Sequence, residues 1–262
     1  MAPKVAIVYY SMYGHIAQLA QAEKKGIEAA GGTADLYQYV RKPIPSVSNH
    51  QHDPIHSVHL RDTTFLPVPA ESTDIPQQSR VTQDRRVMTD PCNRIEETLP
   101  QEVLGKMHAP AQDTSIPFIT PDILKTYDAF LFGIPTRYGT YSAQWKTFID
   151  KLGQLWMTGA LYGKYFGLFV STATAGGGQE STCINALSSW VHQGMIYVPL
   201  GYATTFQIQS ALDEVRGGSP WGAGTFASGD GSRQPSAREI ELATAQGKGF
   251  WDHVSKVSFG AA

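Results

Sequence analysis

Short apolar runs alternate with stretches of helical periodicity along most of the chain. The first run, Val5 to Tyr10, is rich in β-branched and aromatic residues and predicts a strand buried on both faces, as in a covered parallel sheet. From Gly14 onward the apolar spacing becomes helical. The apolar side of this predicted helix comprises Ile16, Leu19, Ala20, Ile27 and Ala30. Residues 33–39 predict a second strand, which completes a strand–helix–strand unit.

The second half of the chain continues the alternation. Further buried strands are predicted at Ala129–Ile134, Tyr165–Val170 and Met195–Leu200. The glycine-rich residues 201–235 predict a long ordered loop or an excursion over the surface. Five strands alternating with helices predict an α/β fold, with a parallel sheet, right-handed crossovers and helices on both faces.

Local sequence also predicts where helices begin. Thr120-Pro-Asp122 provides an N-cap residue, a proline at the first helical position and an acid in the first turn. Ser142 is a candidate cap for the next helix, and a further helix is expected from about Gln179 to Gln193. Ser236-Ala-Arg-Glu239 has the pattern of a capping box and opens a last helix.

Between these two parts, from about residue 41 to residue 95, both periodicities are lost. The segment is rich in Pro, His, Ser, Thr and Gln, and a connection of this length without structure is unusual in a compact domain. We therefore interpret the chain as a single domain interrupted by a disordered surface insertion, by a small subdomain, or by a segment absent from the mature protein, such as a translated intron. No metal is predicted, because the histidines of this segment match no metal-site spacing. They are His50, His52, His56 and His59.

Composition narrows the class of protein. The hydrophobic fraction of 42% and the charged fraction of 17% are ordinary for a soluble globular protein. A net charge of -2 gives no reason to expect a nucleic-acid partner or an anionic membrane. No apolar run approaches the ~20 residues that span a bilayer, and a strand begins too early to leave room for a signal peptide. With only two cysteines, these features predict a cytoplasmic protein with reduced thiols.

Polar or glycine-rich loops follow three of the predicted strands, after Tyr10, Ile134 and Val170. In a parallel sheet, ligands bind beyond the carboxyl ends of the strands. The first loop leads into a helix N-terminus, where free backbone N–H groups and the helix dipole favour an anion. Because the loop has neither a Walker lysine nor a G-x-G-x-x-G pattern, a permanently bound phosphate is favoured over one that is transferred. The aromatic residues expected beside a flat ring in the same pocket are Tyr13, Tyr138 and Trp156.

These loops resemble the WrbA-like family (type IV) of NAD(P)H:quinone oxidoreductases, a branch of the flavodoxin-like fold. The matching stretches are Tyr9–Ile16, Gly133–Gly139, Gly159–Lys164, Gly176–Glu180, His192–Met195 and Gly229–Ser236. They cover the chain apart from residues 41–95, and without that segment about 205 residues remain, a usual size for one domain. The resemblance implies a doubly wound five-stranded parallel sheet in the order 2-1-3-4-5.

The family binds FMN noncovalently, which implies roles for individual loops. The phosphate loop corresponds to Ser11, Met12, Tyr13, Gly14, His15 and Ile16. The loop along the isoalloxazine ring corresponds to Pro135, Thr136, Arg137, Tyr138, Gly139 and Thr140. The loop on the polar edge of the ring corresponds to Ser171, Thr172, Ala173, Thr174, Ala175 and Gly176. Ala173 stands where the family commonly has glycine, so a positive φ at this position would be strained.

Single residues outside these loops also match the family. His192 corresponds to a histidine that reaches the flavin site across a subunit contact. Tyr13 corresponds to a contact of NADH or NADPH, and Trp156 to an aromatic wall on which the substrate stacks. Without the motifs around them, Trp156 would be interpreted as a core residue and Arg137 as a surface charge.

The resemblance implies an FMN-dependent enzyme in which NADH or NADPH reduces quinones by two electrons, through ping-pong hydride transfer. The flavin performs the chemistry, so no catalytic side chain is assigned. The family also implies a homo-oligomer, either a dimer or a tetramer. The alternative is a flavodoxin-like electron carrier, or a structural protein with vestigial flavin binding, because a fold alone does not determine function. Flavodoxins are typically strongly acidic, so the net charge of -2 argues against the carrier.

Overall fold

The computed structural model describes residues 2–38, 99–107, 109 and 115–259. All of these belong to one compact unit of the chain. The segment of residues 41–95, with its histidines and its alternative interpretations, lies outside the described residues. The expectation of one domain with an inserted segment therefore stays a prediction.

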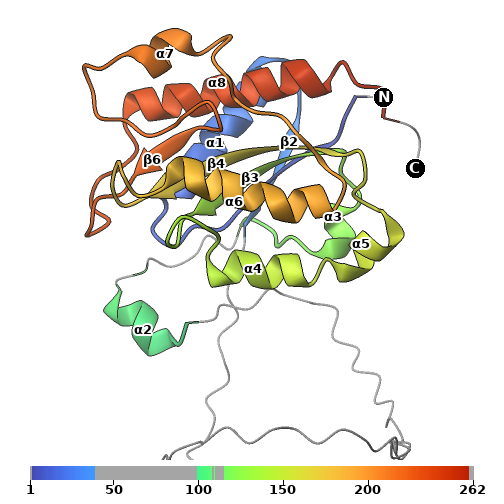
Figure 1. The fold of residues 1–262 in the computed structure, drawn as a ribbon, viewed down its shortest axis with the longest axis horizontal. Coiled ribbons are helices and arrows are strands. Elements are labelled where there is room, and N and C mark those ends of the chain that lie inside the picture. The colour runs from blue at the N-terminus through green and yellow to red at the C-terminus, as the bar shows by residue number, and fades with distance from the viewer. Residues whose placement is uncertain (1, 39–98, 108, 110–114, 260–262) are drawn as a thin grey trace, which may run out of the picture. The chain divides into compact units, whose positions relative to one another are not determined.

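The described residues form a six-stranded sheet in which every paired strand is parallel to its neighbour (Figure 1). The strands are β1 (Val5–Tyr9), β2 (Ala34–Gln38), β3 (Ala129–Pro135), β4 (Tyr165–Thr172), β5 (Ile196–Tyr197) and β6 (Gly224–Phe226). Five of them run in the order β2-β1-β3-β4-β5, which confirms the predicted order.

The edge of the sheet beyond β4 differs from the prediction. β5 is much shorter than the expected strand Met195–Leu200, and it pairs only with the beginning of β4. Pro199 has no N–H group and cannot extend the ladder. The end of β4 pairs instead with β6, so that Val170 lies opposite Gly224. The predicted loop or surface excursion of residues 201–235 therefore contains a sixth strand and a short helix, neither of which was predicted.

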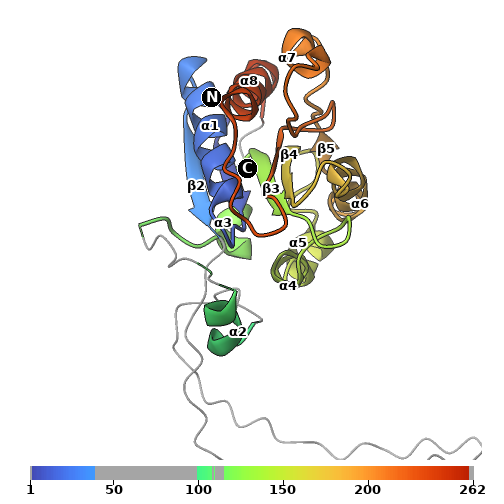
Figure 2. The same ribbon diagram turned by 90° about the vertical axis from the view of Figure 1, so that its left-hand side faces the viewer.

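Helices cover both faces of the sheet, as predicted (Figure 2). They are α1 (His15–Ala29), α2 (Gln101–Lys106), α3 (Pro121–Leu124), α4 (Ala143–Asp150), α5 (Gly153–Thr158), α6 (Gln179–His192), α7 (Phe206–Ser210) and α8 (Ala237–Val254). α1 and α8 pack on one face, and α4 and α6 pack on the other. None of the helices within the described ranges is both long enough and apolar enough to cross a membrane.

The helix starts follow local sequence, with one exception. The Thr120 hydroxyl accepts the Ile123 N–H, and Ser236 and Glu239 form the predicted capping box. Ser142 occupies the N-cap position of α4, but its hydroxyl makes no capping hydrogen bond there. Ser142 is therefore the N-cap residue, as predicted, but it does not cap the helix with its side chain.

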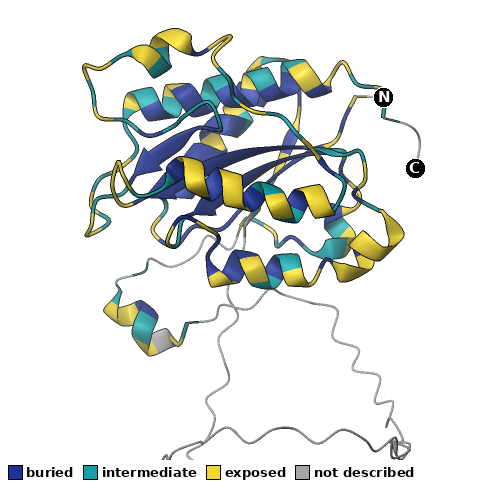
Figure 3. Ribbon diagram, viewed as in Figure 1, coloured by how far each residue is buried: buried dark blue, intermediate teal, exposed yellow. Residues whose placement is uncertain are grey.

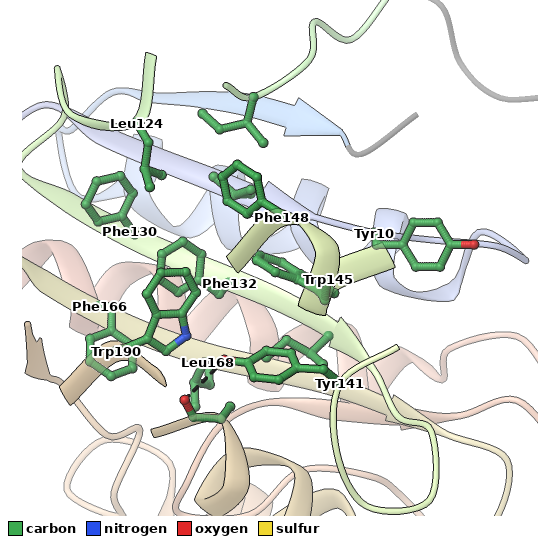
Figure 4. Close-up of a cluster of buried hydrophobic side chains, with 14 of the residues drawn as sticks. Tyr10, Leu124, Phe130, Phe132, Tyr141, Trp145, Phe148, Phe166, Leu168 and Trp190 are labelled. Atoms are coloured by element: carbon green, nitrogen blue, oxygen red, sulfur yellow. Dashed lines mark hydrogen bonds between the residues drawn. The ribbon is translucent and has the colours of Figure 1, made fainter. Parts of the chain in front are cut away.

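The strands of the sheet are buried along most of their length (Figure 3). Buried aromatic side chains fill the layer between the sheet and the α4–α6 face (Figure 4). Phe132 of β3 stacks on Trp190 of α6, with ring centroids 4.1 Å apart. Trp145 of α4 meets Phe132 edge to face and donates its indole N–H to the Gly133 carbonyl at 2.9 Å. This packing fixes the end of β3, from which one of the predicted site loops leaves the sheet.

Candidate active site

A cavity of about 390 Å³ lies at the carboxyl ends of β1, β3 and β4. Its volume is within the range of small-molecule sites. All three predicted loops contribute to its wall. Of the residues proposed from sequence, those that line the cavity are Ser11, Met12, Tyr13, His15, Ile16, Pro135, Thr136, Arg137, Tyr138, Ser171, Thr172 and Ala173. The structure therefore brings the first loop together with the second and third, which follow it in the sequence by more than 100 residues.

The first loop ends at the N-terminus of α1. Gly14 is the N-cap residue and has φ of 88°, a conformation that glycine adopts without strain. The buried Ser11 hydroxyl accepts the Ala17 N–H at 3.3 Å. In the part of the chain that the structure describes, the N–H groups of His15 and Ile16 have no backbone or side-chain acceptor. Such groups at a helix N-terminus can bind a phosphate.

The second loop is a tight turn. Arg137 and Thr140 exchange two backbone hydrogen bonds of 2.9 and 3.0 Å, and the residues between them, Tyr138 and Gly139, both have positive φ. This is the pattern of a type I′ turn. A tyrosine in this conformation costs on the order of 1–3 kcal/mol, and such strain is concentrated at functional sites. Its ring is fully exposed at the cavity.

Side chains from α6 hold this turn against the protein. The Thr136 hydroxyl is 2.7 Å from the Thr182 hydroxyl and accepts the Gly139 N–H. Asn185 donates from its amide nitrogen to the Gly139 carbonyl at 2.7 Å. The turn is thus fixed from behind while the Tyr138 ring stays free.

The third loop follows β4. Ser171 and Thr172 are buried, and the Thr172 hydroxyl donates to the Thr174 carbonyl at 2.8 Å. Among the described non-glycine residues, positive φ occurs only at Tyr138 and Ser228. Ala173 therefore avoids the strain that a positive φ would have imposed, and alanine fits the backbone of this loop.

A fourth segment lines the cavity and was missed in the sequence. It comprises Ala227, Ser228, Gly229, Asp230 and Gly231. We refer to residues 227–231 as the fourth wall. The family motif Gly229–Ser236 overlaps this segment and could have drawn attention to it, but no site role had been attached to the motif.

Several predicted residues do not line the cavity. Those within the three loops are Gly14, Gly139, Thr140, Thr174, Ala175 and Gly176. Trp156 and His192 do not line it either, because α5 and the end of α6 lie away from the carboxyl ends of the strands (Figure 1). Both side chains are exposed, and the 59% exposure of Trp156 excludes the alternative that it is a core residue of this chain.

The ionisable side chains of the cavity include His15, Arg137 and Asp230. Within the described ranges, no cluster of His, Cys, Asp or Glu could hold a metal ion. Cys183 lies in the core behind the site, where burial raises the pKa of its thiol to about 12. A thiol with this pKa is a poor nucleophile at neutral pH. The cavity thus offers a phosphate-binding helix end, buried hydroxyl groups and exposed tyrosine rings, a set of groups that fits FMN.

Comparisons with known proteins also indicate an FMN site. The sequence model of the NADPH-dependent FMN reductase family matches residues 120–208. The chain is 48% identical over 257 residues to minor allergen Alt a 7 of Alternaria alternata, covering 98% of each protein. It is 48% identical over 256 residues to NAD(P)H quinone oxidoreductase PST3 of Candida albicans, covering 98% of this chain and 100% of the relative.

A solved structure supports the fold. The WrbA-like flavodoxin from Agrobacterium tumefaciens superposes with a TM-score of 0.51 at 16% sequence identity, covering 97% of this chain and 98% of that one. Together, these similarities confirm the predicted resemblance, the flavodoxin-like fold, and FMN and NAD(P)H as the family's cofactors. The chain therefore belongs to the family of NAD(P)H quinone oxidoreductases that includes this Candida albicans relative.

Proposed function

We propose that this protein binds FMN noncovalently in the cavity and uses NADH or NADPH to reduce quinones by two electrons. The observation that carries the proposal is the convergence of the three loops on one cavity, with a helix N-terminus and exposed tyrosine rings in its wall. The name of the Candida albicans relative, an NAD(P)H quinone oxidoreductase, supports the same activity.

Each loop has a distinct part in this proposal. Residues 11–16 would hold the phosphate through the α1 dipole and its free N–H groups. The turn after β3 would lie along the flavin ring, and residues 171–176 would face its polar edge. Bound FMN supplies the redox chemistry, because its ring can accept a hydride and pass two electrons to a quinone.

The shape of the cavity favours a ping-pong order of reaction. Tyr13 and Tyr138 both line the cavity and expose their rings to solvent. They can orient a flat nicotinamide or a flat quinone by stacking. Because both partners need this one aromatic surface, the oxidised nicotinamide leaves before the quinone enters. No side chain is assigned as a general acid.

The proposal includes a homo-oligomer, either a dimer or a tetramer. In a single chain Trp156 and His192 do not line the cavity, but a neighbouring subunit could bring them there. Large apolar side chains are exposed around them, which is typical of an interaction surface. These side chains are Trp156, Met157, Tyr162 and Val191. We also propose a cytoplasmic location, where NADH and NADPH are available, and cell fractionation tests it.

The experiment that tests the function is a titration of the purified full-length chain with FMN, followed by flavin fluorescence. We expect quenching to saturate at one FMN per chain. The loaded protein should then oxidise NADH or NADPH beyond one equivalent per FMN only when benzoquinone is present, and it should form benzohydroquinone in equal amount. Stoichiometric FMN binding without quinone turnover would favour the electron carrier, and absence of FMN binding would contradict both functions.

A further inference from the structure

The fourth wall forms neither a helix nor a strand. The Gly231 N–H donates to the Ser228 carbonyl at 3.3 Å within it, and further bonds hold its two ends. Ala227 continues β6 and donates its N–H to the Thr172 carbonyl at 2.8 Å. Six residues later, the Arg233 N–H donates to the Ala227 carbonyl at 3.1 Å. Between them Ser228 has φ of 64°, which is strained for a residue with a side chain. The wall is thus a loop closed at a neck, where Ala227 meets Arg233.

The Arg233 side chain holds this neck from behind. Its Nη1 donates to the Phe226 carbonyl at 2.8 Å and to Glu239 Oε2 at 2.9 Å. Its Nη2 donates to the Val215 carbonyl at 3.3 Å, and the guanidinium lies 5.6 Å from the centre of the Phe226 ring. One side chain therefore connects β6, the segment before it and the first turn of α8.

Glu239 anchors the arginine from the interior. Its side chain is fully buried, and its two oxygens accept hydrogen bonds from four groups. The donors are the Gly217 N–H, the Thr225 hydroxyl, Arg233 and the Ser236 N–H, at 2.7 to 2.9 Å. Breaking a buried ion pair by removing one partner leaves an uncompensated charge, which strongly favours the intact arrangement.

Hydrogen bonds also connect this neck to the phosphate loop. His15, almost completely buried in the cavity wall, donates from Nε2 to the Arg233 carbonyl at 2.7 Å. One turn further along α1, Gln18 donates to the side-chain oxygen of Gln234 at 2.7 Å. A displacement of Arg233 would therefore move the fourth wall and the phosphate loop together.

We propose that Arg233 and Glu239 form a positioning pair, which holds the fourth wall and, through His15, the phosphate loop in the conformation that binds FMN. This inference rests on the FMN binding proposed above. Neither side chain lines the cavity, so both act through the residues that they hold. The pair determines how tightly the flavin is retained and leaves the chemistry of the bound flavin unchanged.

The test compares substitutions of Arg233 by FMN fluorescence quenching. Arg233→Met removes every side-chain hydrogen bond that Arg233 donates, and we expect the Kd for FMN to rise at least tenfold. Arg233→Lys keeps the positive charge beside Glu239 and should recover part of this loss. With FMN at saturation, kcat for benzoquinone should stay within twofold of the wild type, while the FMN concentration for half-maximal activity rises. A general loss of packing would instead lower the melting temperature of the FMN-free protein and would lower kcat at saturating FMN.

Asp213→Asn serves as the matched control. It breaks an exposed ion pair with Arg238, on the same first turn of α8, but that pair makes no contact with the neck. Its FMN affinity should equal that of the wild type.

Three results would separate the possibilities. Wild-type affinity in Arg233→Met would overturn the positioning pair and leave the proposed function intact. A wild-type protein that fails to bind FMN would overturn both. If circular dichroism shows that Arg233→Met does not fold, FMN binding is measured instead on Arg233→Lys and Glu239→Gln, which keep polar groups at both positions. Weaker FMN binding in these folded variants supports the pair, and unchanged binding overturns it.

Discussion

A single buried carboxylate in α1 is the clearest departure from the sequence pattern at the scale of a residue. Glu23 is completely buried, and neither side-chain oxygen has a hydrogen-bond partner in the part of the chain that the structure describes. The periodicity predicted the apolar side of α1, and Ile16, Leu19, Ala20 and Ile27 are indeed buried. It could not predict a buried glutamate, because charged residues are rarely buried without a partner. Only the packing of α8 over α1 places it inside.

Burial raises the pKa of Glu23 well above its ordinary value of 4.5. The stability that this carboxyl contributes is therefore complete below pH 4.5 and is lost as the pH rises through the pKa of the folded protein. We expect Glu23→Leu to raise the free energy of unfolding at pH 7.5 by about 1–3 kcal/mol, because an unsatisfied buried polar group is removed. The gain should shrink at pH 4.

Urea denaturation at the two pH values measures this effect. Glu28→Leu is the control, since the Glu28 side chain lies on the exposed side of the same helix, and it should leave the stability almost unchanged. Equal or lower stability of Glu23→Leu at pH 7.5 would show that burial of the Glu23 carboxyl costs little free energy of unfolding.

At the scale of elements, long apolar runs were predictable and short pairings were not. β1, β3 and β4 follow from apolar runs whose residues are buried on both faces. β6 has only three residues, too few to show a period, and it forms because β5 leaves the end of β4 unpaired. The sequence pattern could not predict the close approach of α1 and α8 either, because that approach depends on which glycines lie at the contact between the two helices.

A substitution of Gly26 in α1 tests how closely α1 and α8 pack. A Cβ added there would lie 2.0 Å from the Thr244 carbonyl oxygen in α8, a backbone atom that cannot move alone. Helix propensity favours alanine over glycine by about 1 kcal/mol, but overpacking costs about 1–3 kcal/mol or more. We expect the collision to dominate, so Gly26→Ala should lower the free energy of unfolding by about 1–2 kcal/mol.

Chemical denaturation of Gly26→Ala beside Gly105→Ala measures the difference. Gly105 lies inside α2, and an added Cβ there would meet no atom within 4 Å. Gly105→Ala should be neutral or slightly stabilising. If both substitutions changed stability alike, the α1–α8 contact would be looser than its geometry indicates.

At the scale of the whole molecule, the three-loop cavity could be predicted because parallel strands bring their carboxyl ends to one edge of a sheet. Each loop was identifiable from residues adjacent in sequence, such as Ser11–Ile16. The fourth wall was not, because it depends on β6 and on the distant Arg233–Glu239 pair. Trp156 and His192 lie outside the cavity of this single chain, so the substrate wall at Trp156 and the contact of His192 across a subunit interface stay predictions.

The exposed residues of α5 therefore provide the test of assembly. We expect the FMN-loaded protein to scatter light as a dimer or a tetramer. Trp156→Glu places a charge among exposed apolar side chains, so it should shift the protein toward monomers and lower kcat/KM for quinone at least tenfold. Its melting temperature should fall only in step with the loss of assembly, because the exposed side chain stabilises little within one chain. Lys25→Glu, at an exposed position of α1, should change neither assembly nor turnover. A loaded monomer with full quinone turnover would show that a single chain forms the complete site, and Trp156 and His192 would then have no part in it.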